Sequence, residues 1–255
     1  MSKTSFISLL EQMKNKPIYY HEPKIKNLSK YYKSRKKTVR RIIQTGIIEF
    51  NPIDKSEAFL EQLETDHLKF VILSLDTVGS TVLANTIEPK TYALITSIIA
   101  YEISNIVSLF NGYVLKYTGD GIIAYFPEPS FISMNDLSVD CALSLRALFV
   151  KVINPLFKIY KFPAIDIRIG LDAGEAYVQT IGNPSAKQHK DIIGIVISLA
   201  AKIQAKAKTN EIYLGEVVER NLHISWRERC KEVVDIVDWK YINHDGTKYK
   251  IYSIN

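Results

Sequence analysis

The sequence is poor in cysteine and has no long uncharged apolar run. Its two cysteines, Cys141 in a helical pattern and Cys230 in a charged loop, show no metal-ligand spacing and suit a reducing compartment. No stretch of about 18 apolar residues is free of charge, which argues against a membrane-spanning helix. The first apolar stretch ends early, at Glu11 and Gln12, so we expect no signal peptide. Together these absences predict a soluble, cytoplasmic protein, and no internal repeat or low-complexity tract is visible.

The charge of the chain is concentrated near its beginning. The net charge is +6 over 255 residues, whereas residues 1–50 alone contain 12 basic and three acidic side chains. A basic arm of this kind can bind nucleic acid or an anionic membrane surface. The alternative is a helix whose apolar stripe docks on the core, and for that reason we expect no stable nucleic-acid or membrane partner. The stripe consists of Tyr31, Tyr32, Val39, Ile42 and Ile43.

Apolar periodicity, interrupted by proline and glycine, divides the chain into helices and strands. Helices are predicted over residues 5–16, 28–45, 56–66, 89–110, 135–149 and 195–208. Strands are predicted over residues 70–76, 165–173, 175–180, 212–214, 233–237 and 248–253, with a hairpin over 113–126 and a loop at 182–184. The order β-α-β-β-α-β implies an α+β fold, in which a split and mostly antiparallel sheet carries helices on one face.

Two aspartates lie beside glycine at the ends of apolar strands. Asp76 ends the run that begins at Phe70, and Asp120 lies between Gly119 and Gly121 at the tip of the predicted hairpin. A strand that stops on a carboxylate exposes it at a sheet edge, and a hairpin tip can aim a second carboxylate there. Such a pair suits Mg²⁺ or Mn²⁺ held against a triphosphate. The alternative is that Asp76 caps a helix and that the Gly-Asp-Gly segment is an ordinary turn.

The surroundings of the two aspartates form a recognisable pattern. Asp76 begins D-x-x-G-S-T, and Lys116 begins K-x-x-G-D-G-x-x-A-x-F around Asp120. Together the two motifs resemble the catalytic domain of class III nucleotide cyclases. The resemblance implies a ferredoxin-like catalytic domain over residues 67–255, preceded by a basic, largely helical extension over residues 1–66.

The resemblance assigns the neighbourhood of Asp76 and Asp120 to metal and phosphate binding. It implies that both carboxylates bind two divalent metal ions, Mn²⁺ or Mg²⁺, with the backbone carbonyl of Thr77 as a further ligand. One metal would acidify the ribose 3′-hydroxyl, which attacks the α-phosphate in line while pyrophosphate leaves, and the other would hold the triphosphate. Backbone N–H groups at a helix start would cradle the β- and γ-phosphates, namely those of Val78, Gly79, Ser80 and Thr81.

A downstream stretch matches the same family in part. The family pattern Asp-x-x-Gly-x-x-x-Asn-x-x-x-Arg is met by Asp191 and Gly194. Ser198 stands where Asn orients the ribose, and Lys202 stands where Arg meets the charge at the α-phosphate; both project from one helical face. Because an ammonium replaces the planar fork of Arg poorly, a degenerate domain that binds without catalysing stays open. Residues 168–174 resemble the R-x-G-x-x-x-G strand of the family, with glycines for close packing.

Hydrogen bonding alone leaves the nucleobase open. In the resembled family, residues at the positions of Lys116 and Asp191 usually read adenine through its exocyclic amine and a ring nitrogen. Cytosine presents the same two groups, and uracil could offer O4 to Lys116 and N3–H to Asp191. A free catalytic domain with relaxed Asn and Arg positions resembles the pyrimidine cyclases of bacterial antiphage systems, which make cUMP or cCMP for a separate effector. We therefore expect a pyrimidine cyclase, with UTP slightly ahead of CTP. An adenylate cyclase making cAMP and an inactive basic-arm adaptor are the alternatives.

The resemblance also implies how the protein assembles. The metal carboxylates of one subunit would face the base-reading and charge-stabilising residues of another across a two-fold axis. Since one chain contains both sets, a symmetric homodimer would hold two composite active sites. The expected partners are therefore a nucleoside triphosphate, a second copy of this chain and a separate effector that responds to the cyclic nucleotide.

Overall fold

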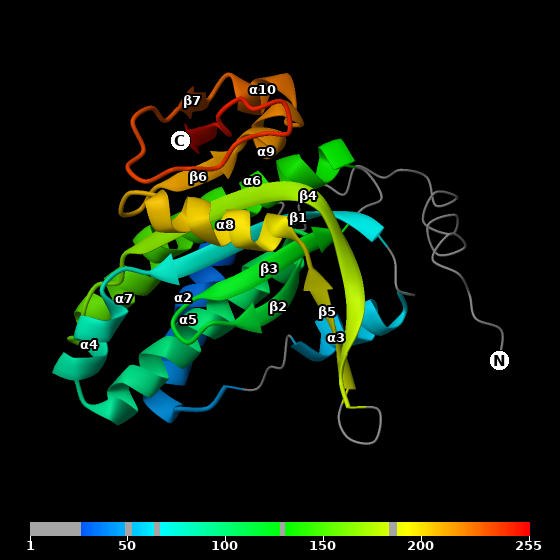
Figure 1. Ribbon diagram of the computed structural model, residues 1–255. Coiled ribbons are helices and arrows are strands. Elements are labelled where there is room, and N and C mark those ends of the chain that lie inside the picture. The colour runs from blue at the N-terminus through cyan, green and yellow to red at the C-terminus, as the bar shows by residue number, and fades with distance from the viewer. Residues whose placement is uncertain (1–26, 49–52, 64–66, 128–130, 184–187) are drawn as a thin grey trace.

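The computed structural model describes residues 27–48, 53–63, 67–127, 131–183 and 188–255, which form a single sheet packed between helices (Figure 1). The described strands are β1 (His67–Thr77), β2 (Tyr113–Tyr117), β3 (Ile122–Pro127), β4 (Ile167–Gly182), β5 (Gln188–Ile193), β6 (Ile212–Gly215), β7 (Cys230–Glu232) and β8 (Ile251–Ile254). Their order is β2-β3-β1-β4-β6-β8-β7, and β5 pairs with the second half of β4. Among the described strands only β4 and β6 pair in parallel, so the predicted, mostly antiparallel sheet is confirmed.

The described helices include short ones that were not predicted beside those that were. They are α2 (Leu28–Thr45), α3 (Ile53–Glu61), α4 (Ser80–Thr86), α5 (Pro89–Leu109), α6 (Phe131–Leu148), α7 (Asn154–Ile159), α8 (Ile195–Lys206), α9 (Glu216–Arg220) and α10 (Ile224–Arg227). A π-helical turn, Phe149–Ile153, joins α6 to α7. The succession β1, α5, β2, β3, α6, β4 confirms the β-α-β-β-α-β core and the α+β class.

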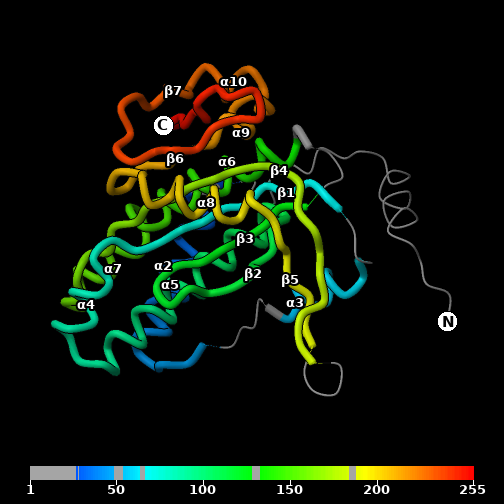
Figure 2. Tube along the Cα trace, viewed as in Figure 1, coloured from blue at the N-terminus to red at the C-terminus, as the bar shows by residue number. Residues whose placement is uncertain are grey.

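Helices cover both faces of the sheet. Val71, Leu73 and Leu75 of β1 join the core beneath α2, α5 and α6. Phe70 and Ile72 join a second core beneath α3 and α8. The prediction of helices on one face is therefore wrong, and the trace shows α8 in front of the sheet with α2 and α5 behind it (Figure 2). The physical reason lies in β1, whose uninterrupted apolar run must be covered on both sides.

Helix α2 lies in the N-terminal extension and packs on the helices behind the sheet. It begins after the N-cap Asn27 and ends at Gly46, which has the left-handed φ of 70° that suits a helix C-terminus. Three residues of its apolar stripe, Tyr32, Val39 and Ile42, are buried. Both the predicted bounds of this helix and the docking of its stripe on the core are confirmed.

A buried ion pair fixes α2 to α5. Arg35 donates two hydrogen bonds to Glu102, from Nε at 2.8 Å and from Nη2 at 2.6 Å, and Glu102 is wholly buried. Among the described helices, α5 alone is long and apolar enough to cross a membrane. It packs here against β2, α6 and α2, and its face contributes Ile98, Ile103 and Ile106 to the core, which is the position of a core helix.

Several predicted elements differ from the structure. The strands predicted over 165–173 and 175–180 are one strand, β4, because Gly174 stays in the ladder opposite Phe70. Strand β5 was not predicted. The strand predicted over 233–237 is irregular, since the chain turns at Asp235 with a φ of 58°, and β7 forms before it. The helix predicted over 5–16 lies outside the described residues.

Candidate active site

Backbone pairing brings Asp76 and Asp120 together. Asp76 lies at the end of β1, Asp120 lies in the turn between β2 and β3, and the antiparallel pairing of β1 with β3 ends beside both. The Thr77 hydroxyl donates a 2.7 Å hydrogen bond to Asp120 Oδ2. At Gly121 a Cβ atom would lie 2.6 Å from the Leu75 carbonyl oxygen and 3.0 Å from Asp76 Oδ1. Glycine is therefore required for the close approach of the two carboxylates.

The electrostatics of this pair suit a divalent cation. Burial and the neighbouring charge of Asp120 raise the pKa of Asp76, which means that the two carboxylates resist sharing one site when both are ionised. Carboxylate oxygens are the ligands that Mg²⁺ and Mn²⁺ prefer, and one or two of them commonly complete their sphere with waters and substrate phosphates. The described residues gather no group of three or more His, Cys, Asp or Glu. The Asp76–Asp120 pair therefore matches a site in which waters and substrate phosphates complete the coordination of the metal.

Arg168 lies beside Asp76, although the sequence analysis gave its strand only a packing role. It is the register partner of Asp76 across β1 and β4, and its positive charge lowers the pKa of Asp76 in opposition to Asp120. Its Nε is buried and makes no hydrogen bond to the described residues. The R-x-G motif was visible in the sequence, but the strand pairing that sets Arg168 beside Asp76 was not.

The segment after Asp76 has the geometry of an anion-binding turn, with one correction. Gly79 takes a left-handed φ of 75° and precedes α4, and no side chain caps that helix. The N–H groups of Ser80 and Thr81 in its first turn therefore lack intrahelical acceptors. The N–H of Val78, predicted to help cradle the phosphates, instead donates to the carbonyl of Asp166 at 2.8 Å. This bond ties the turn to the start of β4 and removes Val78 from the available donors.

Lys116 and Asp191, predicted to read the base, form an ion pair. Lys116 Nζ lies 3.3 Å from Asp191 Oδ2, and the two side chains are 45% and 21% exposed. They come from β2 and β5, which meet on the face of the sheet that carries α3. The sequence analysis placed both residues in the site and Lys116 in the predicted hairpin, but it did not predict the strand that carries Asp191. The exposed fractions leave both groups accessible to a base.

Ser198 and Lys202 lie on the exposed face of α8. They are one helical turn apart, while Leu199, Ala200 and Ile203 on the other side are buried. This confirms that both project from one helical face. Lys202 makes no ion pair with any described residue.

The structure forms two separate groups of site residues. Asp76, Asp120 and Arg168 interact at the end of β1, whereas Lys116 pairs with Asp191 elsewhere on the sheet. The charges that chiefly act on Asp76 are those of Asp120 and Arg168, not those of the lysines. Within the described chain, neither Lys116 nor Lys202 pairs with the carboxylates of the first group.

The chain resembles known proteins over most of its length. The family model described as the adenylate and guanylate cyclase catalytic domain matches residues 64–255. Cytidylate cyclases from Escherichia coli and Staphylococcus aureus are 27% identical over 206 residues and 24% identical over 165 residues. These alignments cover 75% and 63% of this chain but 44% and 39% of the relatives, so the chain spans less than half the length of either relative.

Solved structures show the same fold. The adenylyl cyclase CyaB from P. aeruginosa superposes with a TM-score of 0.65 at 20% identity, over 76% of this chain and 96% of that one. The guanylate cyclase domain of RhGC from Catenaria anguillulae superposes with a TM-score of 0.61 at 18% identity, over 74% of this chain and 98% of that one. With the family match over residues 64–255, these likenesses show that the chain belongs to the adenylate and guanylate cyclase catalytic domain family, whose class III fold it adopts.

Proposed function

We propose that this protein is a class III nucleotide cyclase, and that it converts a pyrimidine nucleoside triphosphate to a 3′,5′-cyclic nucleotide and pyrophosphate. Domains of this family act on nucleoside triphosphates and generally use divalent metals. The observation that carries the proposal is the approach of Asp76 and Asp120 at the end of β1, with an anion-binding turn directly after them. A pair of carboxylates and a turn with available N–H groups thus lie together at the end of β1, which supports binding of a metal ion with a triphosphate.

The residues at the end of β1 would bind the triphosphate. Asp76 and Asp120 would hold two divalent ions, Mn²⁺ or Mg²⁺, with the carbonyl of Thr77 as a further ligand. When bound, these ions would neutralise the triphosphate and lower the pKa of the 3′-hydroxyl. The N–H groups of Gly79, Ser80 and Thr81 would donate to the β- and γ-phosphates.

The second group of residues would hold the nucleoside. Lys116 would donate to a ring acceptor of the base, and Asp191 would accept from its exocyclic amine, in place of the ion pair that they now form. Ser198 would orient the ribose, and Lys202 would stabilise charge at the α-phosphate. The new bond joins the 3′-oxygen to the α-phosphorus, the bond to pyrophosphate breaks, and the hydroxyl proton leaves to solvent.

A symmetric homodimer would bring the two groups together. Because Lys202 faces solvent and pairs with neither carboxylate in the described chain, a second copy can place it opposite Asp76 and Asp120. Each dimer would then hold two composite sites. The protein would act in the cytoplasm, and its product would pass to a separate effector in antiviral defence.

The names of the relatives favour cytosine as the base. Both curated relatives with pyrimidine names are cytidylate cyclases, which reverses the order of UTP and CTP predicted from the sequence. A putative adenylate cyclase 3 from Rhizobium meliloti, 25% identical over 60% of this chain, keeps ATP as the second candidate. We therefore place CTP first, UTP second and ATP third.

The proposal is tested by giving the purified protein each of ATP, GTP, CTP and UTP with Mn²⁺ and identifying the products by mass. We expect cCMP and pyrophosphate from CTP, and none of either after metal is removed with EDTA. A larger kcat/KM for ATP than for both pyrimidines would overturn the base assignment and leave the cyclase activity standing. Pyrophosphate release from none of the four would favour an inactive nucleotide-binding or adaptor protein.

A further inference from the structure

The exposed face of α2 is strongly cationic. Between Leu28 and Thr45 the helix has seven basic residues and no acidic residue. One of them, Arg35, turns inward to Glu102. The other six side chains are exposed, and none forms an ion pair with a described residue: Lys30, Lys33, Lys36, Lys37, Arg40 and Arg41. Over 18 residues this helix presents positive charge along about 27 Å.

The cationic surface continues onto a part of the chain far away in sequence. Lys151 of the π-helical turn, Lys158 of α7 and Lys161 after α7 are exposed beside α2. Two adjoining hollows, which share Pro155, lie in this surface. The smaller, of about 390 Å³, is lined by residues that include Lys33, Lys36 and Lys151.

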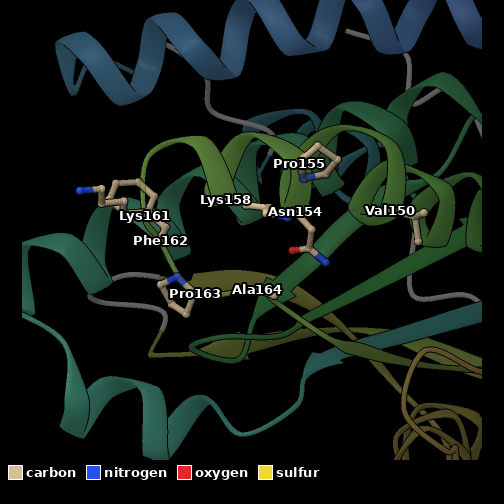
Figure 3. A pocket seen from close by; sticks show the side chains of 8 residues that line it. All are labelled: Val150, Asn154, Pro155, Lys158, Lys161, Phe162, Pro163 and Ala164. Atoms are coloured by element: carbon tan, nitrogen blue, oxygen red, sulfur yellow. The ribbon is translucent and has the colours of Figure 1, made fainter.

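The larger hollow has a different lining. Its volume is about 770 Å³, and Figure 3 shows it extending from Lys161 at one end to Val150 at the other. Lys158 and Lys161 line it together with apolar groups, among them Phe162 and Pro163. Together the hollows combine positively charged rims with an apolar lining.

The surface is held in a fixed shape. The bidentate pair of Arg35 with buried Glu102 anchors the middle of α2, and it also neutralises the Glu102 carboxylate beneath this face. The Tyr32 hydroxyl donates to the carbonyl of Ser144 at 3.0 Å, and Lys151 Nζ lies 5.8 Å from the centre of the Tyr32 ring. Because the helix backbone is already held in place, binding phosphates requires little further ordering of it.

We propose that α2, the π-helical turn and α7 form a binding surface for single-stranded nucleic acid. A row of unpaired cations matches a phosphate backbone, and hollows with apolar walls can receive sugars and bases that project from it. A bilayer fits less well, because its flat surface cannot enter the hollows. In addition, an amphipathic helix binds a membrane through its apolar face, and here that face of α2 is buried in the core. The recognition is of the backbone and independent of sequence.

None of the residues that line the hollows belongs to the candidate active site. The binding surface lies on the layer of helices behind the sheet, whereas α8, with Ser198 and Lys202, lies on the opposite face (Figure 1). Bound nucleic acid would therefore leave Ser198 and Lys202 uncovered and would hold the enzyme on the strand. The inference departs from the expectation, drawn from the sequence, that the protein has no stable nucleic-acid partner.

The test measures the affinity of the full chain for a labelled single-stranded RNA or DNA of about 20 nucleotides, over a range of salt concentrations. The variant Lys33→Gln/Lys36→Gln/Lys151→Gln removes the three lysines around the smaller hollow. The control Lys231→Gln/Lys240→Gln/Lys248→Gln removes the same charge from exposed positions in the C-terminal part of the chain. We expect the first variant to weaken binding roughly tenfold or more and to reduce the salt slope by about 2, because each lost phosphate contact contributes roughly 0.7.

The control variant should bind like the wild type. Equal weakening by both variants would mean that net charge alone binds the strand, and would overturn the proposal. So would the absence of binding by the wild type at about 0.1 M salt, or binding to vesicles of anionic phospholipid without binding to either oligonucleotide. Circular dichroism of both variants excludes misfolding. Because binding is measured without substrate, failure here would leave the cyclase proposal untouched.

Discussion

At the scale of single residues, Asp76 and Asp120 are brought together against their own repulsion. The pairing of β1 with β3 and the missing side chain of Gly121 place them, and the positive charge of Arg168 offsets part of the cost. Proteins accept such unfavourable contacts at functional sites, where a ligand later relieves them. The arrangement therefore predicts that these side chains serve activity more than stability.

Replacing either carboxylate should abolish activity. We expect Asp76→Ala and Asp120→Ala each to lower kcat/KM by roughly a thousandfold or more, because the triphosphate and the 3′-hydroxyl lose their metal. The thermal midpoint of Asp76→Ala should not fall, since the variant removes one of two repelling charges. Glu57→Ala removes an exposed carboxylate elsewhere and should change neither quantity. A tenth of wild-type activity in either site variant would refute the assignment.

Asp172 is a second buried carboxylate, and it should make stability depend on pH. Burial raises its pKa to about 7, and the Tyr249 hydroxyl donates a 2.5 Å hydrogen bond to it. Because the folded-state pKa lies above the unfolded value, the contribution of this group to stability is complete below pH 3.8 and is lost as the pH rises through about 7. Asp172→Asn should remove this loss.

The measurement is the free energy of unfolding of Asp172→Asn and wild type at several pH values. The difference should shift in favour of the variant by on the order of a few kcal/mol between about pH 4 and pH 7, and then level off. Comparing the two proteins cancels the contributions of other groups that titrate in this range. A difference that does not change with pH would show that Asp172 is ionised throughout.

Sequence reasoning found most of these residues because their motifs are local. Gly79 and Gly121 mark turns that must bend sharply, and the aspartates stand beside them. It missed Arg168 as a neighbour of Asp76, and it counted the N–H of Val78 as free. Both facts depend on which strand lies next to β1, and no local pattern contains that information.

At the scale of secondary-structure elements, the most tightly constrained contact is that of α8 with β4. A Cβ atom on Gly170 would lie 2.5 Å from the carbonyl oxygen of Ala200 and would also collide with the backbone of Gln204. Neighbouring Gly174 has more room, since its Cβ atom would lie 3.5 Å from Val196. Both glycines belong to the R-x-G-x-x-x-G strand, and the structure assigns the close packing to the first.

Gly170→Ala should therefore push α8 away from the sheet. We expect it to lower stability by about 1 to 3 kcal/mol or more, because backbone atoms cannot move as a flexible side chain can. Since α8 also positions Ser198 and Lys202, activity should fall as well. Gly174→Ala is the matched control and should be nearly neutral in thermal denaturation. Equal losses of stability would contradict the close contact at Gly170.

A buried ion pair adds to the apolar contacts that attach α2 to the core. Arg35→Met leaves Glu102 buried and without its cation, which should cost about 3 to 5 kcal/mol. The double variant Arg35→Met/Glu102→Leu should recover most of that loss, because it leaves no uncompensated charge. Chemical denaturation of the three proteins measures this coupling. If the double variant were as unstable as the single one, packing of the Arg35 stem would be the main contribution.

The sequence defined α2 better than it defined β5, for physical reasons. The ends of α2 are set by its own residues, Asn27 and Gly46, so its bounds followed from local chemistry. β5 begins with polar residues and forms by pairing with the far half of β4, from Tyr177 to Gly182. The helices on two faces were also missed, although the uninterrupted apolar run of β1 indicates burial on both sides.

At the scale of the whole molecule, one chain contains two half-sites. The carboxylates and Arg168 lie in one group, and Lys116 with Asp191 in the other, while Lys202 faces solvent without an ionic partner in the described chain. A two-fold axis can close two such half-sites at once, because each subunit supplies what the other lacks. This arrangement makes complementation between two damaged chains possible.

Asp120→Asn and Lys202→Ala should each be inactive alone and active when mixed. In a mixed dimer one site carries both substitutions, while the other combines intact Asp76 and Asp120 from one subunit with intact Lys202 from its partner. Random exchange makes half of the dimers mixed, with one working site of two, so roughly a quarter of wild-type activity should return. Mixing Asp120→Asn with Asp76→Ala is the control, since both substitutions damage the same half-site and every site then has a damaged carboxylate pair. If differently labelled subunits exchange and no activity returns in the first mixture, each site lies within one chain.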